Sequence, residues 1–589
     1  MPARLSLAGS EVPSSGSRPL PEVPQQAHSL TLSSGAVFGA ALAIQLLGVV
    51  GSIFLYKHIG VNTAGIALIG TAQLFLLIGS SINGVGDLRL GTAYTYYLAR
   101  GKPPLENTGT YLAVRTAMVA AAGVILFGIA PLELAGHRLA TGTVEMTSIG
   151  VFVALPVLWS FSTVYNQMFI GLGNSLKAQY PGLVEAIVRL PVLIYVAYSV
   201  KSLEGMTVAY AVGAAASAAY SLPALLPRLR SFRRAEAAGL FRFAWPLMGS
   251  LMLNYLVTNM VPLIVDAGLG ATQLSVFLNA NGWRILVLSL PAAVTTPLFP
   301  YLAGLHRQER FERLRASTWQ ALRFSAMLLV PGVVALVTYR ATFLDVFANH
   351  LYARAGQVPL AILVVSAIPL ALSQIMQSSI NAIGRQRLEL YITSTQVVVL
   401  FAAVALLMPP WGIMPHSLGI VAGSLAVLAS SVAALGLNTY FMETLIRVHI
   451  RPLSIARITL SAAGSFASLA LLNHSHLFPV QSGLQLLTAV LLGFLVYFLV
   501  LAAVGELTRE DVLRIGTSIS GAPGFRWFLE RVARICWART PPGLPPVDLR
   551  RARGLRSTEL PEPFSGTTEL PQMDTDVAEE PGEPPERTA

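Results

Sequence analysis

Three arginines lie inside segments of the chain that are otherwise long and apolar: Arg115, Arg189 and Arg284. An arginine at the centre of a membrane costs at least ~2.5 kcal/mol unless it faces water or a partner. Its guanidinium is permanently charged and planar, and its fork of N–H donors suits phosphate. These three residues are therefore candidates for binding an anionic group within an apolar protein.

Arg284 ends the sequence Asn279-Ala-Asn-Gly-Trp-Arg and follows the start of an apolar segment over 274–304. About ten residues of helix rise roughly 15 Å, so Arg284 is predicted near the midplane of a membrane. An anion contact is the favoured role. The alternative is a structural bond to backbone carbonyls or to Asp266.

Arg189 lies four residues after Glu185, so the two share one helix face in the favourable acid-before-base order. A structural ion pair is favoured, with a substrate contact by Arg189 and ion coupling by Glu185 as alternatives. Arg115, two turns into its segment, could face a cavity or extend its charge to the headgroups. Arg89 is interpreted as a residue of the membrane edge that could meet an anionic substrate.

Uncharged polar residues and one further acid extend the candidate set. Asp266, near the end of the segment 244–267, is a candidate for ion or proton coupling, although a solvated helix end is favoured. The amides are candidates for lining a sugar path, with helix-to-helix bonding as the alternative. They are Asn254, Gln374, Gln377 and Asn381.

The elements that must position these residues are membrane-spanning helices. Hydrophobic residues make up 54% of the chain and charged residues 12%, against roughly 25% charged in soluble domains. We therefore predict an all-α integral membrane protein with about 14 transmembrane helices. The spans are 36–56, 64–86, 107–130, 147–171, 181–200, 206–227, 244–267, 274–304, 321–347, 357–383, 390–409, 416–441, 456–473 and 483–505.

Lysines and arginines alternate between the connections of these spans. Counted together with the parts of the spans that flank them (Arg323, Arg340 and Arg457), the even-to-odd connections hold nineteen and the odd-to-even connections hold five. This asymmetry predicts a multi-pass protein of the plasma (inner) membrane with both termini in the cytoplasm. The net charge of +11 is accordingly attributed to contact with membrane lipids, and no nucleic acid is expected as a partner.

An internal repeat divides the spans into two sets. Gly173 and Gly384 occur in similar segments, each followed seven residues later by tyrosine, at an offset of 211 residues. The turn glycines Gly60 and Gly270 are 210 apart. This repeat predicts two six-helix lobes in parallel orientation. Transporters commonly bind substrate between such repeats. The predicted division is a disordered tail (1–34), a first lobe (35–230), a second lobe (231–441), two additional helices (442–506), an amphipathic cytoplasmic helix (507–540) and a disordered Pro-rich acidic tail (541–589).

Several motifs resemble those of polysaccharide-exporting flippases, which include O-antigen flippases. They are Leu240-Phe-Arg-Phe-Ala-Trp-Pro-Leu-Met-Gly-Ser250, the run PAAVTTPLFPYLAGL from Pro291 to Leu305 with the Arg-rich stretch after it, and Asn381-Ala-Ile-Gly-Arg-Gln-Arg-Leu388. These flippases belong to a superfamily (MOP) with MATE exporters and lipid II flippases. The resemblance covers about residues 35–505. It implies two MATE-like lobes around a central cavity, two additional helices and alternating access.

The resemblance also implies a substrate, a polyprenyl-(pyro)phosphate-linked oligosaccharide moved to the outer leaflet for polysaccharide biosynthesis. Arg284 then becomes the candidate pyrophosphate contact, because the related lipid II flippase has a functionally important basic residue there. Other polysaccharide-assembly proteins are possible partners. The alternatives are a MATE-type cation-coupled exporter and a lipid II flippase. The exporter calls for acidic residues in the membrane core of the first lobe, and the first two spans offer none before Asp87.

An enzymatic function is not expected. The outer connections are too short for a catalytic domain, and the sequence has no phosphate-binding loop with its lysine, no His-Glu-x-x-His and no nucleophile elbow. His474-Ser-His476 has no acid or cysteine beside it, and Cys536 is the only cysteine. We therefore predict neither a cofactor nor a metal.

Overall fold

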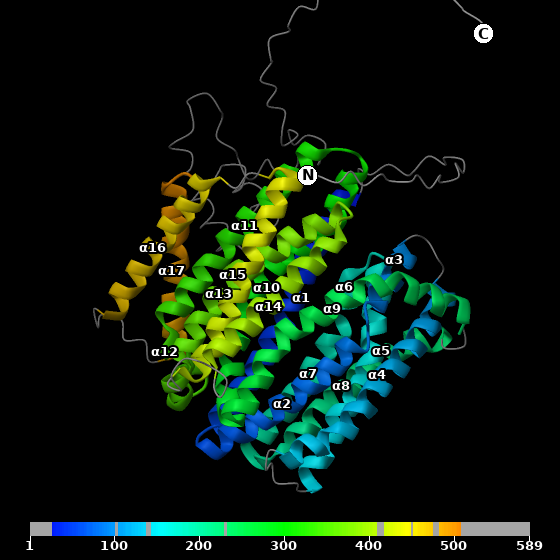
Figure 1. Cartoon of the computed structure of the whole chain (residues 1–589). Coiled ribbons are helices and arrows are strands. Elements are labelled where there is room, and N and C mark those ends of the chain that lie inside the picture. The colour runs from blue at the N-terminus through cyan, green and yellow to red at the C-terminus, as the bar shows by residue number, and fades with distance from the viewer. Residues whose placement is uncertain are drawn as a thin grey trace, which may run out of the picture.

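The computed structural model describes residues 26–99, 104–136, 143–228, 232–408, 418–448, 451–474 and 482–507. Within these ranges every regular element is a helix (Figure 1). The long helices are α1 (Gln26–His58), α2 (Thr63–Val85), α4 (Pro104–Gly136), α5 (Thr143–Gly171), α7 (Tyr180–Tyr195), α8 (Leu203–Leu225), α9 (Arg234–Leu269), α10 (Ala271–Arg307), α11 (Phe311–Thr338), α13 (His350–Ala382), α14 (Gln386–Leu407), α15 (Ile420–Phe441), α16 (Pro452–His474) and α17 (Gly483–Ala503).

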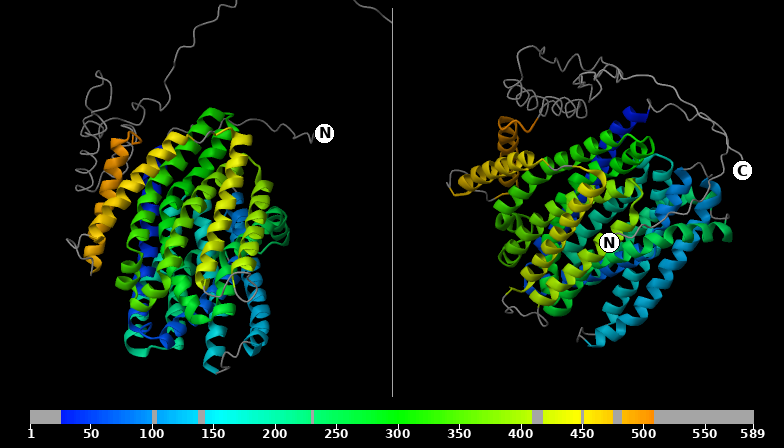
Figure 2. Two further views of the ribbon diagram at one scale, coloured as in Figure 1. Left: turned by 60° about the vertical axis from the view of Figure 1, so that its left-hand side comes forward. Right: turned by 45° about the horizontal axis from the view of Figure 1, so that its top comes forward.

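The helices pack as two bundles with a peripheral pair. The first bundle contains α1, α2, α4, α5, α7 and α8, and the second contains α9, α10, α11, α13, α14 and α15. In Figure 1 the first is mostly blue and cyan, and the second green and yellow. Helices α16 and α17 lie at the edge, against α11 (Figure 2). The predicted fold class is confirmed, and this is a multi-pass membrane protein.

Thirteen helices in the described residues are long and apolar enough to cross a membrane. Helix α10 is not among them, although the sequence predicts a span over 274–304. It is a continuous helix of 37 residues that packs against α2 of the first bundle and α13 of the second. Helix α10, which carries Arg284, therefore lies at the boundary between the bundles.

Other predicted boundaries differ from the structure. Helix α1 begins at Gln26, so residues 26–34, expected in a disordered tail, are helical. The ninth predicted span is two helices, because Tyr339 ends α11 and α12 (Arg340–Phe347) follows directly. The connection after α2 contains a short helix, α3 (Leu90–Ala99). The predicted amphipathic helix and acidic tail after residue 507 lie outside the described residues.

The two ends of the molecule are defined by its connections. At one end α2, α8, α10 and α13 finish and α9, α11 and α14 begin; we call this the arginine-rich end, and the other the opposite end. At the opposite end α2 and α10 cross closely, since a Cβ on Gly70 would lie 2.0 Å from the Ala271 carbonyl oxygen. Asn349, before α13, also donates from Nδ2 to the carbonyls of Tyr56 (3.0 Å) and Gly60 (2.8 Å).

The peripheral pair is fastened to the second bundle by a buried carboxylate. Glu506, directly after α17, accepts hydrogen bonds from Arg323 of α11 (2.8 Å to Nε) and from Ser454 of α16. Arg457 lies 3.5 Å from the same carboxylate. One side chain at the arginine-rich end thus joins three helices, which fixes α16 and α17 beside α11.

Candidate functional site

A polar pocket lies where the arginine-rich connection after α2 meets the second bundle. Its volume is about 290 Å³, and helices α9, α10, α13, α14 and α15 provide most of its wall. The residues that line it are Arg89, Asn254, Val257, Thr258, Arg284, Leu370, Ser373, Gln374, Gln377, Glu389, Thr393, Gln396, Val427, Ser430 and Ser431. The pocket is thus formed mainly by amides and hydroxyls, with two arginines and one carboxylate.

Arg284 reaches this pocket from the boundary helix α10. It is 9% exposed, and its Nε has no hydrogen-bond partner among the described residues. No ion pair joins it to Asp266, which was the alternative considered from the sequence, or to any other described residue. Burying a guanidinium with an unused donor is costly, so the site favours a ligand with negatively charged oxygens.

Arg89 reaches the same pocket from the first bundle. The turn between α2 and α3 holds Leu88 and Arg89 at positive φ, 44° and 62°, a conformation that L-residues rarely adopt. Arg89 Nε is also buried without a hydrogen-bond partner in the described structure. Its terminal nitrogen lies 3.6 Å from Glu389 of α14. Strained backbone of this kind persists where the surrounding structure requires it and is common at functional sites.

Three of the four predicted amides line the pocket: Asn254, Gln374 and Gln377. The fourth, Asn381, donates from Nδ2 to Glu389 (2.6 Å) and so lies behind the pocket wall. Amides offer both donors and acceptors, the groups that sugar hydroxyls need. The pocket therefore brings together five of the predicted residues, which come from three helices and one turn. Their role in substrate binding stays a prediction.

The polar face of α14 was not predicted from the sequence. Glu389, Thr393 and Gln396 all line the pocket and follow one another at spacings of four and three residues. This spacing places side chains on one face of a helix. The only acid of α14, Glu389, lies in the first turn of the helix and not inside the apolar segment, so it did not stand out as a costly buried charge.

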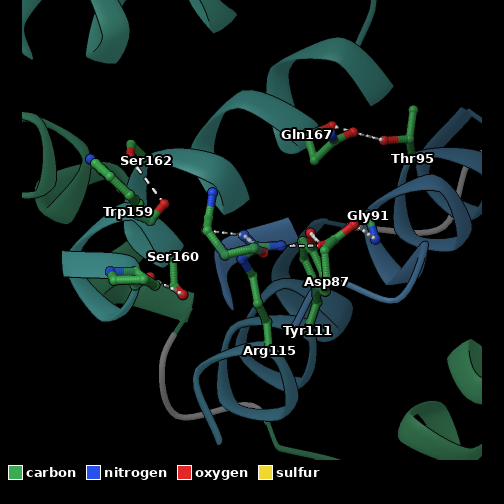
Figure 3. Close-up of polar contacts among 11 residues, drawn as sticks. Asp87, Gly91, Thr95, Tyr111, Arg115, Trp159, Ser160, Ser162 and Gln167 are labelled. Carbon is green, nitrogen blue, oxygen red and sulfur yellow. Dashed lines mark hydrogen bonds and ion pairs between the residues drawn. The ribbon is translucent and has the colours of Figure 1, made fainter. Parts of the chain in front are cut away.

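Arg115 does not line the pocket. It is 1% exposed, forms an ion pair with Asp87 and donates to the Asn83 side chain (2.7 Å). The Tyr111 hydroxyl also donates to Asp87 (2.7 Å), and Figure 3 shows these side chains converging between α4 and the end of α2. Neither predicted placement, in a cavity or at the headgroups, describes Arg115 in this conformation, because its charge is neutralised inside the first bundle.

Arg189 and Glu185 form the ion pair favoured from their spacing, at 2.9 Å on α7. The guanidinium also lies 5.0 Å from the centre of the Tyr210 ring. Neither residue lines the pocket. Asp266 is half-buried near the end of α9 and does not line it either. In the described part of the chain no three His, Cys, Asp or Glu side chains gather as a metal site.

Comparisons with known proteins agree with this architecture. Residues 144–356 match the model of a family described as "Polysaccharide biosynthesis protein". This region contains Arg284 and Asn254. No curated protein matches the chain.

Solved structures of transporters share the fold. The lipid II flippase MurJ in an inward closed conformation superposes with a TM-score of 0.64 at 12% identity, over 79% of this chain and 97% of MurJ. An inward-facing MATE multidrug transporter gives 0.57 at 14%, over 70% and 98%. The MATE multidrug transporter DinF-BH gives 0.55 at 15%, over 72% and 96%.

Identities this low establish the fold alone. The resemblance predicted from the sequence is thus confirmed by the family model over residues 144–356 and by the fold that the chain shares with MurJ and the MATE transporters. These solved structures are of a flippase and of multidrug transporters.

Proposed function

We propose that this protein is a flippase that moves a polyprenyl-(pyro)phosphate-linked oligosaccharide to the outer leaflet of the plasma membrane by alternating access. One observation carries the proposal. Two guanidinium groups, from opposite bundles, face one pocket, and each has a buried Nε without a partner among the described residues. Phosphate oxygens would satisfy both.

The rest of the pocket suits the glycan. Apart from the charged residues, its wall is mostly amides and hydroxyls from α9, α13, α14 and α15. The polyprenyl tail needs no polar pocket, because it can stay in the lipid while the head moves between the bundles. Arg284 and Arg89 are the proposed (pyro)phosphate contacts, and Asn254, Gln374 and Gln377 the proposed sugar contacts.

A MATE-type exporter of cationic compounds is the first alternative. Cation binding calls for a carboxylate that is free to face the substrate, and Glu389, the only carboxylate among the described residues that line this pocket, already faces Arg89. The arginines would also repel a cation, since like charges at short distance in a desolvated site are unfavourable. The pocket therefore favours an anionic substrate. A lipid II flippase would use the same phosphate chemistry and differs in the glycan.

Reconstitution into proteoliposomes tests the proposal. A fluorescent polyprenyl-diphosphate disaccharide, made accessible to an external quencher only after translocation, should cross with wild type at least tenfold faster than with Arg284→Gln. Arg340→Gln, which removes an exposed arginine of α12, is the matched control and should equal wild type. Transport of a cationic dye with no movement of the disaccharide lipid would favour the exporter and contradict the proposal.

A further inference from the structure

Glu389 occupies an unusual place in the pocket. It lies in the first turn of α14 and is 18% exposed. One carboxylate oxygen accepts a hydrogen bond from Asn381 (2.6 Å), and the other lies 3.6 Å from Arg89. Asn381 and Glu389 belong to the second bundle, whereas Arg89 follows α2 of the first. The ion pair therefore spans the two bundles at the arginine-rich end.

The pair with Arg89 is loose. At 3.6 Å the two atoms attract one another but are too far apart for a hydrogen bond. Arg89 is 33% exposed, so solvent screens the attraction further. The bond from Asn381 is short and remains available to Glu389 whatever Arg89 does. Glu389 can thus lose Arg89 as a partner without becoming an unpaired carboxylate.

We infer that Glu389 is an internal competitor of the substrate: it neutralises Arg89 in the empty protein and is displaced by an anionic headgroup. The inference rests on the proposed function. It adds Glu389 as a residue that sets both the affinity for the substrate and the closure of the two bundles at the arginine-rich end. When the pocket is empty, the Arg89–Glu389 pair adds one attraction between the bundles at the arginine-rich end. A phosphate bound to Arg89 takes over its charge, and Asn381 retains the released carboxylate.

The geometry around Arg89 fits such an exchange. Its backbone is held at φ 62° by the α2–α3 turn, where Leu90 N–H donates to the Asp87 carbonyl (2.7 Å). The backbone of Arg89 is therefore held in place by this turn, without a contribution from Glu389. Arg284 in the same pocket has no such competitor among the described residues. The two arginines thus differ. Arg284 can bind an anionic headgroup directly, whereas Arg89 exchanges the Glu389 carboxylate for the headgroup.

Binding of undecaprenyl pyrophosphate to purified protein in nanodiscs tests the competition. Glu389→Gln removes the charge and keeps an acceptor for Asn381, so this variant should bind the probe about twofold to fivefold more tightly, the size of a partly exposed ion pair. Arg89→Gln should bind more weakly. In the double variant the gain from Glu389→Gln should vanish, because the competitor acts only through Arg89. Glu312→Gln, an exposed acid of α11, is the matched control and should equal wild type.

Closure is measured separately and without a ligand. With Cys536→Ser as background, a cysteine replacing Thr258 in the pocket wall is labelled by a water-soluble thiosulfonate. Glu389→Gln should raise the labelling rate severalfold. Two results would overturn the inference and leave the proposed function intact. One is tight binding by wild type with no gain in affinity in Glu389→Gln. The other is an equal gain in affinity when Glu389→Gln is combined with Arg89→Gln. Absence of binding in every variant would overturn both the competition and the proposed function.

Discussion

Gly173 and Gly384 end equivalent helices, α5 and α13, in the same way although they lie 211 residues apart. Both have left-handed backbones, with φ of 77° and 79°. In each turn the glycine N–H donates three residues back, Gly173 to Ile170 and Gly384 to Asn381, both at 3.0 Å. The next residue donates five residues back, which completes a Schellman motif. The repeat read from the sequence is therefore present in the backbone at this turn.

Alanine at either glycine should destabilise the protein through the backbone alone. A Cβ at Gly173 or Gly384 would meet nothing within 4 Å, so no clash contributes. The left-handed conformation costs a non-glycine residue about 1–2 kcal/mol. Thermal unfolding of Gly173→Ala and Gly384→Ala should show a lowered midpoint. Gly436→Ala, equally uncrowded but within α15, is the control and should be neutral or slightly stabilising. Equal behaviour of all three would contradict this reading.

Much of the fold could be predicted from composition and turn chemistry. Apolar length indicates spanning helices because unpaired backbone groups are too costly in lipid. The turn at Gly384 could be read because glycine is favoured in left-handed caps. The break between α11 and α12 at Tyr339 could not be predicted, because Tyr339 is buried with helical neighbours on both sides and no glycine or proline lies next to it. Such a break is decided by packing.

The candidate site was only partly predictable. Arg284 and Gln374 could be proposed because polar groups inside apolar segments are costly and need a reason. Whether such a residue faces a cavity or a partner depends on long-range neighbours. Arg115 illustrates the limit, because its partner Asp87 lies 28 residues earlier and outside its own helix. Glu389 was missed because its importance comes from Arg89, 300 residues away.

Asn349 should control closure at the opposite end. Its Oδ1 caps α13 by accepting from Leu351 N–H (3.0 Å), while its Nδ2 donates to two carbonyls of the first bundle. Asn349→Asp keeps the oxygen that caps α13 and removes the N–H groups that donate to the first bundle, whereas Asn349→Ala removes both the cap oxygen and these donors. Each neutral hydrogen bond contributes about 1 kcal/mol. Both variants should therefore loosen the contact between the bundles, and Asn349→Ala should also lose about 0.5–2 kcal/mol of capping.

The measurement is an electron-spin distance between labels at Val61 and Ala355, both exposed, in a Cys536→Ser background. Asn349→Asp should shift the distribution to longer distances, with a smaller loss of thermal stability than Asn349→Ala. A distribution identical to wild type would show that Asn349 only caps the helix.

Arg115 should matter for stability more than for substrate binding. In Asp87→Asn the guanidinium stays buried at 1% exposure without its counter-ion, which costs about 3–5 kcal/mol. Arg115→Met should cost less, because Asp87 is 22% exposed and can be hydrated. The double variant should recover part of the loss. Chemical unfolding in detergent provides the energies. A loss of transport by Arg115→Met with unchanged stability would instead support a substrate contact.

Glu506 should hold the peripheral helices in place. Glu506→Ala leaves Arg323 and Ser454 without their shared acceptor in a buried site, at a cost of about 3–5 kcal/mol. Replacing both partners, in Arg323→Met with Glu506→Leu, should restore much of that stability, because Arg457 is 33% exposed and can reach water. Limited proteolysis between α15 and α16 reports the detachment. Unaltered proteolysis in Glu506→Ala would contradict the anchoring role.

Arg284 is the proposed contact for the (pyro)phosphate of a lipid-linked glycan. Wild type and Arg284→Gln should be purified from native membranes in parallel, and their retained lipids identified by mass spectrometry. We predict a polyprenyl-(pyro)phosphate glycan on wild type that is depleted at least tenfold on Arg284→Gln, with bulk phospholipids unchanged, since a charge-assisted contact contributes about 1.5–3 kcal/mol. Equal amounts of that lipid on both proteins would contradict the role of Arg284.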